Sequence, residues 1–489
     1  MINNIFKKTK IVCTIGPASE KPEVLEQLIL NGMNIARLNF SHGDYAEHLA
    51  KINTIRALEK KLNILIPIML DTKGPEIRTH KFEGGSASIV TGQTIRICMN
   101  EILGNNEKFS VTFPDLYDDV KVGDRIKLDD GNLTLKVTGK DEATREIICE
   151  ALNHHVIRDR RGINCPDTHL SLPFISDRDY KDLVWGCVQG VDYVSASFVR
   201  TADDVNEIRK ILKEHGGEHI KIISKVENTE SVANLDAVIN ASDGLMVARG
   251  DLGVEVPPED VPVIQREMIR KCRILGKPVI TATQMLDSMK TNPNPTRAEV
   301  SDVANAVLES TDSVMLSAES ASGEYPVQAV IMQAKISSRM EEFLNYEAMA
   351  QEAYDTSAKT LNDAIANSVA NTALLLNAKL IVCFSETGST ARRMSKARPV
   401  CPVIEVSNNR AACISGMMSW GVYPKYVKIV PQFIEEMEVL AIHLARVYNI
   451  PAGSKIIITG GTPVGAGKTN FMKVITLDEV KEDIDAWNL

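Results

Sequence analysis

The sequence predicts an α/β protein: a TIM (β/α)8 barrel with an inserted small all-β barrel-like lid domain and a C-terminal α/β domain. Eight short apolar runs alternate with amphipathic helical stretches, which is typical of a barrel. A β-rich insertion interrupts this rhythm, and the pattern changes again after Phe343. The predicted division is barrel 1–71, lid 72–172, barrel 173–343, C-terminal domain 344–478 and tail 479–489.

The barrel prediction depends on continuous apolar runs, which indicate strands buried on both faces by helices. Eight such units in series indicate a closed parallel barrel. The expected strands are Lys10–Ile15, Ile35–Phe40, Ile64–Asp71, Tyr193–Phe198, Lys221–Val226, Gly244–Ala248, Pro278–Ala282 and Ser313–Leu316. The expected helices are Glu23–Asn31, Tyr45–Lys61, Ala202–His215, Val232–Ala241, Val261–Leu275 and Arg297–Glu309.

The insertion follows the third strand and contains the segments GQTIRICMN, GDRIKLDDGNLTLKV and TREIICEAL. These segments alternate apolar and polar residues and carry DG and GN turns, so they predict antiparallel strands. An insertion at the carboxyl end of a barrel strand sits over the barrel mouth, where a lid is useful.

The C-terminal region predicts a separate α/β domain. A helical stretch at Leu361–Asn377 precedes the strand-like runs KLIVCFS, PVIEVS, KIIITGG and FMKVITL. The final segment, DEVKEDIDAWNL, is acidic and is expected to be a solvated tail.

Composition excludes several classes of protein. The 489 residues carry a net charge of −9, so nucleic-acid binding is not expected as the main role. The nine cysteines are odd in number and form no CxxC pair, which favours free thiols in a reducing cytoplasm over disulfides or zinc. Neither a signal peptide nor an 18-residue apolar run is evident, so we expect no membrane association.

Polar residues cluster after the predicted barrel strands, where a TIM barrel places its active site. Structural salt bridges would explain one or two of these residues but explain the whole set poorly. The set is Arg37, Asn39, Ser41, Asp71, Thr72, Lys73, Glu76, Arg78, Lys225, Glu227, Arg249, Asp251, Thr283, Gln284, Ser317 and Glu319.

The composition of this set indicates phosphoryl transfer. Carboxylates without nearby Cys or His ligands suit a hard cation such as Mg²⁺, and Arg and Lys suit a phosphate or carboxylate substrate. The glycines of Ala248–Gly253 allow backbone N–H groups to approach an anion. No Ser-His-Asp order or activated Cys is evident, and phosphoryl transfer needs mainly positioning and positive charge.

Seven segments resemble the motifs of the pyruvate kinase family, in family order: TKIVCTIGPAS, MNIARLNFSHG, LDTKGPEIRT, IISKVEN, MVARGDLGVE, TATQMLDSM and SAESASGEYP. The resemblance covers essentially residues 5–477. It implies transfer of the phosphoryl group of phosphoenolpyruvate to ADP, giving pyruvate and ATP, the last step of glycolysis. It also implies a homotetramer.

The resemblance implies a role for each residue of the barrel mouth. The implied catalytic residues are Lys225, Thr283 and Arg78. The implied substrate-binding residues are Arg37, Lys225, Gly250, Asp251 and Thr283. Glu227 and Asp251 are implied to bind Mg²⁺ or Mn²⁺. Thr283 is implied to act near the enolate, in proton delivery through water.

The resemblance also implies a monovalent-cation site and nucleotide contacts. Asn39, Ser41, Asp71 and Thr72 match the K⁺ site, and Glu76 is the family residue that accompanies K⁺ dependence. The implied nucleotide contacts are Asn39, His42, Arg78 and Arg178. Arg178 stands where the family often has Lys, and these two side chains are not interchangeable.

Two segments of the C-terminal domain invite a nucleotide or phosphate interpretation. Gly460–Thr469 looks like a P-loop, but Gly461 leaves five residues before the GK pair where the motif needs four. We therefore expect a plain turn or a loop over an effector pocket. Thr387, Gly388, Ser389 and Thr390 follow a strand and open a helix, so they suit a phosphate effector or a simple N-cap.

Two other functions remain open from sequence alone. One is another barrel enzyme acting on phosphoenolpyruvate or a 2-keto acid, such as an aldolase-type lyase or mutase, which also uses Glu and Asp to hold Mg²⁺. The other is a non-catalytic sensor in which only the C-terminal domain is active. The lid and Lys225 argue against the first, and the intact set of Lys225, Glu227, Asp251 and Thr283 argues against the second.

Overall fold

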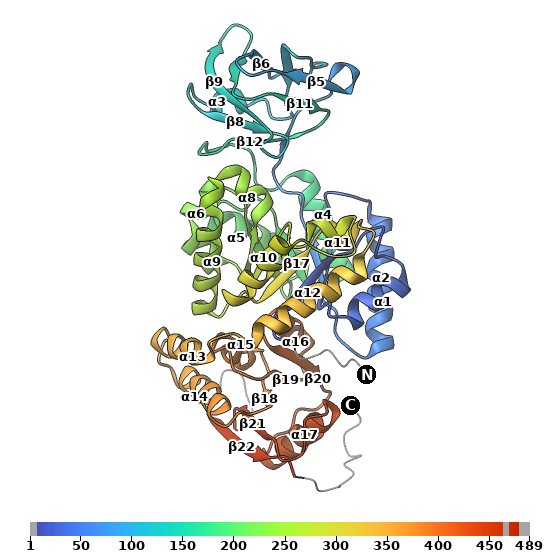
Figure 1. The fold of residues 1–489 in the computed structure, drawn as a ribbon, viewed down its shortest axis with the longest axis vertical. Coiled ribbons are helices and arrows are strands. Elements are labelled where there is room, and N and C mark those ends of the chain that lie inside the picture. The colour runs from blue at the N-terminus through green and yellow to red at the C-terminus, as the bar shows by residue number, and fades with distance from the viewer. Residues whose placement is uncertain (1–6, 463–468, 479–489) are drawn as a thin grey trace. The chain divides into compact units, whose positions relative to one another are not determined.

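A computed structural model describes residues 7–462 and 469–478 of the chain (Figure 1). Its centre is a closed barrel of eight strands in the order β1-β17-β16-β15-β14-β13-β3-β2, which confirms the predicted TIM barrel. The strands are β1 Lys10–Thr14, β2 Ile35–Asn39, β3 Ile68–Asp71, β13 Tyr193–Ala196, β14 Lys221–Val226, β15 Gly244–Ala248, β16 Val279–Ala282 and β17 Ser313–Leu316.

Helices follow the barrel strands, and short polar side chains begin several of them. Asp44, Ser176, Thr201 and Thr296 each accept a hydrogen bond from a backbone N–H of the first helical turn. The helices are α1 Pro22–Leu30, α2 Tyr45–Leu62, α4 Asp177–Gln189, α5 Ala202–Glu214, α8 Arg249–Glu255, α9 Val261–Leu275, α10 Arg297–Leu308, α11 Ala318–Ala321 and α12 Pro326–Glu341.

Two predicted barrel elements differ most from the structure. The third strand begins at Ile68 instead of Ile64, because Asn63 ends α2 in the left-handed conformation and Pro67 lacks an N–H for a strand ladder. The helix expected over 232–241 is two helices, α6 Thr229–Ala233 and α7 Leu235–Ala241. Asn234 separates them, and its side chain donates to the Arg200 carbonyl at 3.2 Å.

The insertion forms the expected β-rich lid with its own apolar core. Its seven-stranded sheet has the order β4-β12-β8-β9-β10-β6-β7, and β11 pairs with β5 in a second sheet. The strands are β4 Ile77–Arg78, β5 Ser86–Ile89, β6 Thr94–Cys98, β7 Lys108–Ser110, β8 Arg125–Leu128, β9 Leu133–Asp141, β10 Glu146–Ala151, β11 His155–Arg158 and β12 Gly162–Asn164, and the one α-helix among them is α3 Leu116–Asp119.

The C-terminal α/β domain contains a five-stranded sheet in the order β20-β19-β18-β21-β22. The sequence did not reveal β20, because Pro424 and Lys425 interrupt its apolar pattern. The strands are β18 Leu380–Phe384, β19 Val403–Ser407, β20 Val422–Tyr426, β21 Lys455–Gly460 and β22 Phe471–Thr476, and the helices are α13 Tyr346–Asp355, α14 Leu361–Leu375, α15 Ser389–Lys396, α16 Arg410–Met417 and α17 Ile434–Val447.

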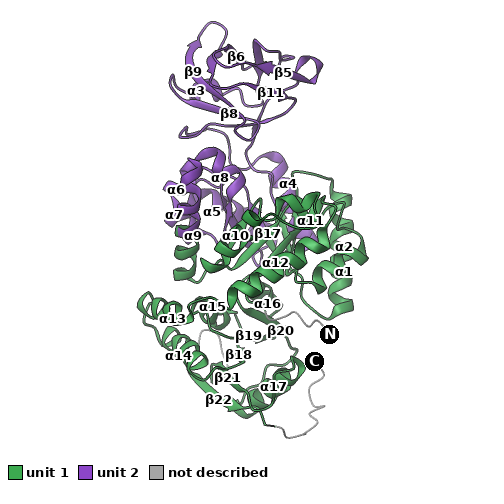
Figure 2. Ribbon diagram, in the orientation of Figure 1, with its two compact units in different colours: residues 1–70, 191–193, 267–489 green, residues 71–190, 194–266 purple. Residues whose placement is uncertain are grey.

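The backbone contacts divide the chain into two compact units (Figure 2). The first comprises residues 1–70, 191–193 and 267–489, and the second comprises 71–190 and 194–266. This division follows the density of contacts, and the predicted domain boundaries remain predictions.

A buried ion pair joins the barrel part of the first unit to the C-terminal domain. The Arg398 Nη1 lies 3.0 Å from Asp312 Oδ1, and both side chains are almost fully buried. Arg398 also donates to the Ser310 carbonyl, while Asp312 accepts from the Trp420 N–H. The two charged side chains and the residues that hydrogen-bond to them are therefore all buried.

Replacing Arg398→Met should destabilise the first unit by about 3–5 kcal/mol, because it leaves the buried Asp312 carboxylate without its cation. Denaturant unfolding followed by circular dichroism measures the effect. Arg339→Met removes an exposed ion pair on α12 and should cost less than about 1 kcal/mol. Equal losses in the two variants would contradict this account of the buried pair.

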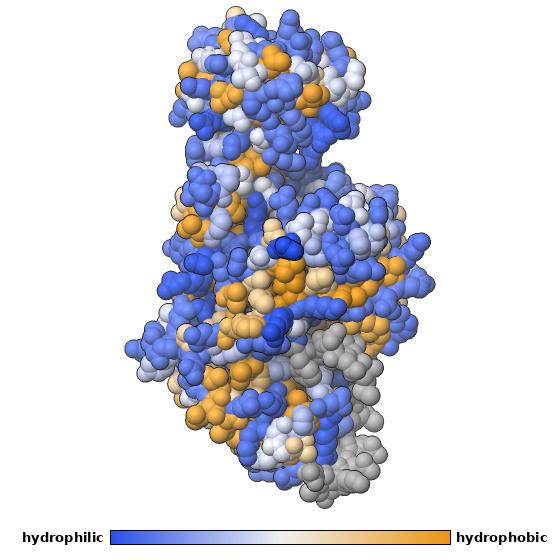
Figure 3. All heavy atoms as spheres, viewed as in Figure 1, coloured by the Kyte–Doolittle hydropathy of each residue, from blue (hydrophilic) through white to orange (hydrophobic). Residues whose placement is uncertain are grey.

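The surface is mostly polar, with apolar residues gathered in a few places (Figure 3). On α14, Leu361 and Leu375 are 65% and 85% exposed. Among the described residues, no helix has both the length and the apolar character needed to cross a membrane. All nine cysteines are free thiols, and each except Cys187 is buried.

Candidate active site

Lys225 occupies the centre of a buried polar cluster in the second unit. Its side chain is only 12% exposed, and its Nζ lies 2.9 Å from Glu227 Oε1 and 3.4 Å from Asp71 Oδ1. It also donates to Ser197 Oγ at 2.9 Å. One ammonium group thus meets two carboxylates, and this arrangement offsets the cost of burying each charge.

Glu227 is fully buried just beyond the end of β14. One oxygen faces Lys225, and the other accepts the Phe198 N–H at 2.6 Å. Burial raises the pKa of Glu227 to about 7, although the charge of Lys225 opposes this rise. A further cation near Glu227 would favour the ionised form of this buried carboxyl group.

Asp251 lies in the short helix α8, directly after β15. Burial raises the pKa of Asp251, and the charge of Lys225 opposes this rise. Gly250 directly precedes Asp251 and places no side chain over the backbone there. Lys225, Glu227 and Asp251 therefore lie close enough for their charges to act on one another, and their roles remain predictions.

The donor set fits a hard divalent cation. Glu227 and Asp251 offer only carboxylate oxygens, the ligand type that such an ion prefers. No group of three or more His, Cys, Asp or Glu side chains suited to a metal occurs within residues 7–462 and 469–478. Two protein carboxylates suit Mg²⁺, because that ion commonly takes its other ligands from substrate phosphate and water.

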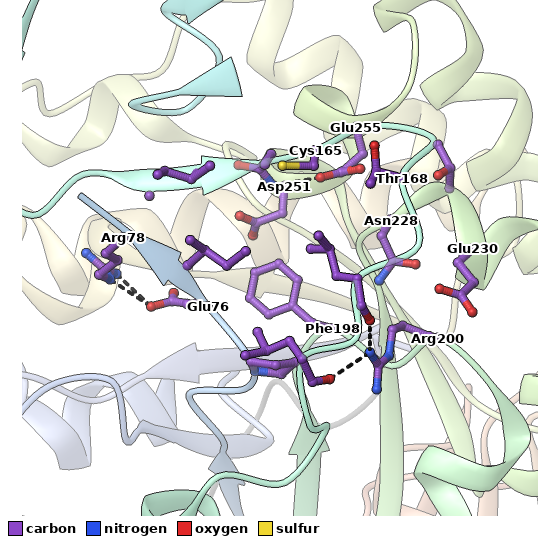
Figure 4. Close-up of a pocket in the computed structure, with 18 of the residues that line it drawn as sticks. Glu76, Arg78, Cys165, Thr168, Phe198, Arg200, Asn228, Glu230, Asp251 and Glu255 are labelled. Carbon is purple, nitrogen blue, oxygen red and sulfur yellow. Dashed lines mark hydrogen bonds and ion pairs between the residues drawn. The ribbon is translucent and has the colours of Figure 1, made fainter. Parts of the chain in front are cut away.

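Next to this cluster, a cavity of about 270 Å³ opens between the lid and the barrel segments of the same unit. Figure 4 shows Asp251 in this cavity between the Glu76–Arg78 pair and Glu255. Arg78 Nε donates to Glu76 Oε2 at 2.9 Å, and Arg78 Nη2 lies 2.9 Å from the same oxygen. The Arg78 guanidinium is therefore held by a carboxylate in this structure.

Lid and barrel segments also meet at the far side of the cavity. Asn164 Nδ2 donates to Glu255 Oε1 at 2.9 Å, and burial raises the pKa of Glu255 to about 7. Arg200 donates to the carbonyls of Leu170 and Leu172, which belong to the segment returning from the lid (Figure 4). These contacts join the segment returning from the lid to barrel residues that line the cavity.

Thr283 follows β16 in the first unit and has an unusual backbone. Its φ is 72°, and that of the next residue, Gln284, is 55°. A β-branched residue in the left-handed region is strained, and such strain gathers at functional sites. The sequence singled out Thr283, but its backbone strain could not be foreseen from it.

Arg37, Asn39 and His42 line one cleft of about 930 Å³ in the first unit. Arg37 is buried, and its Nη1 donates to Thr14 Oγ1 at 2.8 Å. The Asn39 side chain accepts the Ser41 N–H at 3.1 Å, which orders the turn leading to His42. Three of the predicted substrate and nucleotide residues are thus neighbours.

The predicted K⁺ ligands fall into two pairs, one in each compact unit. Asn39 and Ser41 share the turn after β2. Asp71 and Thr72 end β3, where Ser197 Oγ donates to the Thr72 carbonyl at 2.6 Å and contacts Asp71 at 3.3 Å. The four-residue K⁺ site remains a prediction.

Arg178 stands at the beginning of α4 and is half exposed. Its Nε lies 3.8 Å from Asp182 Oδ2, one turn further along the helix. Its contact with nucleotide remains a prediction.

The predicted effector segment lies between β18 and α15. Gly388 caps α15 with a φ of 75°, and Thr387 Oγ1 donates to Ser389 Oγ at 3.2 Å. Thr390 Oγ1 lies 2.8 Å from Thr469 Oγ1. The P-loop-like segment lies partly outside the described residues, but β22 follows it, and a P-loop requires a helix there.

Sequence reasoning missed the end of β13. Ser197 and Phe198 contact Lys225, Glu227 and Thr72, yet no polar residue after this strand was proposed for the site. The rule that barrel sites gather at strand carboxyl ends applies to this strand as to the others. That rule would have identified Ser197.

Comparisons with known proteins agree with this architecture. The family model for the pyruvate kinase barrel domain matches residues 6–330, and that for the pyruvate kinase alpha/beta domain matches residues 363–475. The fold and the matched family models identify a phosphotransferase built on a TIM barrel.

Individual relatives support the same conclusion. Pyruvate kinases of Geobacillus stearothermophilus and Staphylococcus aureus (strain MRSA252) are 49% and 47% identical to this chain over 475 and 473 residues, which are 97% and 96% of this chain and 81% and 80% of those proteins. A solved pyruvate kinase from Cryptosporidium parvum is 39% identical, with a TM-score of 0.91 and coverage of 97% of both chains. The chain belongs to the pyruvate kinase family.

Proposed function

We propose that this chain transfers the phosphoryl group of phosphoenolpyruvate to ADP, with Lys225 as the cation that stabilises the group in transit. The observation that carries this proposal is the buried Lys225 ammonium held between Asp71 and Glu227. A positive charge in such a water-poor place interacts strongly with charge that develops during the reaction.

The proposed roles follow from chemistry and from neighbours. A terminal oxygen of ADP attacks phosphorus, the bond to the enol oxygen breaks, and Lys225 offsets charge on the moving phosphoryl group. Arg37 and Arg78 hold the phosphate, and the backbone at Gly250 and Asp251 receives the substrate carboxylate.

Enolate protonation completes the proposed reaction. Thr283 orders the water that delivers a proton to the enolate, since a free Thr hydroxyl is itself a poor acid. Its strained backbone is consistent with a position fixed for this purpose.

Glu227 and Asp251 are the proposed holders of Mg²⁺ or Mn²⁺. The ion supplies Lewis-acid stabilisation of phosphoryl and enolate oxygens when bound. The proposed nucleotide contacts are Asn39, His42, Arg78 and Arg178.

A coupled assay for pyruvate and ATP, with and without Mg²⁺, tests the proposed function. ATP formed from phosphoenolpyruvate and ADP supports it. Turnover of phosphoenolpyruvate without ATP would favour a lyase or mutase, and absence of turnover would favour a non-catalytic sensor.

K⁺ should activate the enzyme. Glu76 is negatively charged, so it cannot provide the positive charge that a lysine at this position would supply in place of the ion. The proposed ligands are Asn39, Ser41, Asp71 and Thr72. Replacing K⁺ by tetramethylammonium at constant ionic strength should lower kcat at least about tenfold, or about 1.4 kcal/mol of barrier. Equal rates in the two salts would disprove the K⁺ requirement.

A Glu76→Lys variant extends this test. It should reduce the difference between K⁺ and tetramethylammonium, since the lysine ammonium takes the place of the ion's charge. Lys73 lies 3.9 Å from Glu76 and loses its acidic neighbour in this variant, so Glu76→Gln serves as the matched control for that loss.

The C-terminal domain is proposed to bind a phosphate-bearing effector at Thr387, Gly388, Ser389 and Thr390. Kinetics that do not respond to fructose bisphosphate, glucose 6-phosphate, ribose 5-phosphate or AMP would count against this site. We further propose a cytoplasmic homotetramer, to which the exposed apolar residues of α14 are suited as a subunit contact.

A further inference from the structure

Glu405 is a buried carboxyl group in the C-terminal domain that the proposed reaction does not use. It lies in the middle of β19, between β18 and β20, and its exposed fraction is 0%. Neither of its carboxyl oxygens has a hydrogen-bond partner among the described residues. An unpartnered buried carboxyl is costly, so it calls for an explanation.

The Glu405 carboxyl is aimed at the beginning of α15. Its Oε1 lies 3.2 Å from the point where a Cβ on Gly388 would stand, and Gly388 is the N-cap of that helix. Its Oε2 lies only 2.1 Å from the corresponding point on Gly416 in α16. Two glycines therefore make room for this group, directly against the proposed effector segment.

Few charges face Glu405 from the surrounding elements. Among the residues that the structure describes, the cation that acts on it is Arg392 of α15, whose Nη1 lies 3.5 Å from Ser415 Oγ. The thiols of Cys383 on β18 and Cys413 on α16 are the other titratable neighbours, and the facing residue on β20 is Pro424.

Burial dominates the titration of this group. It raises the pKa of Glu405 to about 8, although Arg392 opposes the rise. Burial raises the pKa of Cys413 to about 12 and raises the pKa of Cys383 well above its ordinary value, so neither thiol ionises near neutral pH. Glu405 is therefore the group of this cluster whose charge changes between pH 7 and 9.

The charge of Glu405 matters because an anion at a helix N-terminus depends on backbone N–H groups and a positive local potential. An ionised carboxylate within a few ångströms cancels that potential and repels a phosphate dianion, while a neutral carboxyl does neither. The low-dielectric surroundings strengthen the repulsion.

We propose that Glu405 controls anion binding at Thr387–Thr390: a phosphate ester binds when Glu405 is protonated, and its binding draws a proton onto this residue. This inference rests on the proposed effector site and adds to it a proton linkage. The effector response of the enzyme then weakens as pH rises through the slightly alkaline range.

Binding of ribose 5-phosphate, glucose 6-phosphate, fructose bisphosphate and AMP to the full chain, measured by calorimetry from pH 7 to pH 9, tests the proposal. Phosphate esters are already largely dianionic in this range, since their second pKa is about 6. The wild-type affinity for a ligand that binds should fall about tenfold, and Glu405→Gln should remove this dependence. Buffers of different ionisation heat should reveal the proton taken up.

Glu386→Gln is the matched control, because it removes an exposed carboxylate from the same segment. It should shift the affinity equally at every pH and keep the wild-type slope. Parallel slopes in the wild type and Glu405→Gln would overturn the proton linkage while leaving the effector site intact. No binding to either chain at any pH would overturn the effector site and the linkage together.

Thermal unfolding gives a readout that needs no ligand. The folded-state pKa of Glu405 is raised above the ordinary value of 4.5, so the folded chain keeps a proton that the unfolded chain releases. The wild-type Tm should therefore fall relative to that of Glu405→Gln as pH rises from about 4.5 to about 8, and the difference should level off above that range. A constant difference would show that Glu405 does not titrate there and would overturn the inference.

Discussion

Lys225→Met should lower kcat by about 10³-fold or more, equivalent to about 4 kcal/mol of barrier. Methionine keeps much of the length of the side chain but removes the ammonium that faces Glu227 and Asp71. Because Lys225 is proposed to act on charge that develops in transit, kcat and kcat/KM should fall together, with little change in the KM for phosphoenolpyruvate.

Lys221→Met is the matched control for this variant. Lys221 lies on the same strand, β14, but is more exposed and pairs loosely with Asp243 at 3.8 Å. The control should keep wild-type kcat. A loss smaller than tenfold in Lys225→Met would remove Lys225 from the chemistry.

Folding must be separated from chemistry in this experiment, since the variant also leaves Glu227 without its cation. That loss is destabilising, but the raised pKa of Glu227 lets it take up a proton instead. The Tm of Lys225→Met in the presence of Mg²⁺ should therefore stay within a few degrees of the wild type. A folded but inactive variant supports the catalytic role.

Glu227→Gln should abolish most of the activation by Mg²⁺. The amide cannot supply the charged oxygen that a hard cation prefers, so kcat should fall by about 10³-fold, or about 4 kcal/mol. The Mg²⁺ concentration for half-maximal activity should rise by at least about 10²-fold, which a titration of initial rates against Mg²⁺ measures.

A second readout for Glu227→Gln does not depend on activity. Mg²⁺ stabilises the folded wild type by binding it, so its Tm should rise with Mg²⁺, while the Tm of the variant should not. Glu214→Gln, an exposed carboxylate at the end of α5, is the control and should behave as the wild type. Wild-type Mg²⁺ dependence in Glu227→Gln would contradict the metal role of Glu227.

The fold was largely predictable, because a strand buried on both faces is recognisable as a run of apolar residues. The run Gly244–Ala248 is apolar throughout, and the structure has it at the predicted position. β20 escaped prediction because Pro424 and Lys425 carry no such mark, and the α6–α7 break depends on a side-chain contact of Asn234 with the Arg200 carbonyl.

The members of the candidate site could be proposed from the sequence, but their contacts could not. Lys225, Glu227 and Asp251 could be expected together because they follow barrel strands. Ser197 donates to the Thr72 carbonyl and accepts from Lys225. These contacts depend on side-chain directions, which the sequence pattern does not reveal. Glu405 likewise reads as an ordinary polar residue until its surroundings are known.

The left-handed backbone at Thr283 and Gln284 destabilises the folded state, and interactions of the rest of β16 must offset this loss. Each left-handed residue of this kind is worth about 1–3 kcal/mol of instability, and two stand in succession. Glycine would relieve the tension at either position, but at 283 it would forfeit the hydroxyl. The chain thus gives up some stability to hold Thr283 in a fixed position. The surrounding barrel, and not the backbone preference of threonine, maintains this conformation.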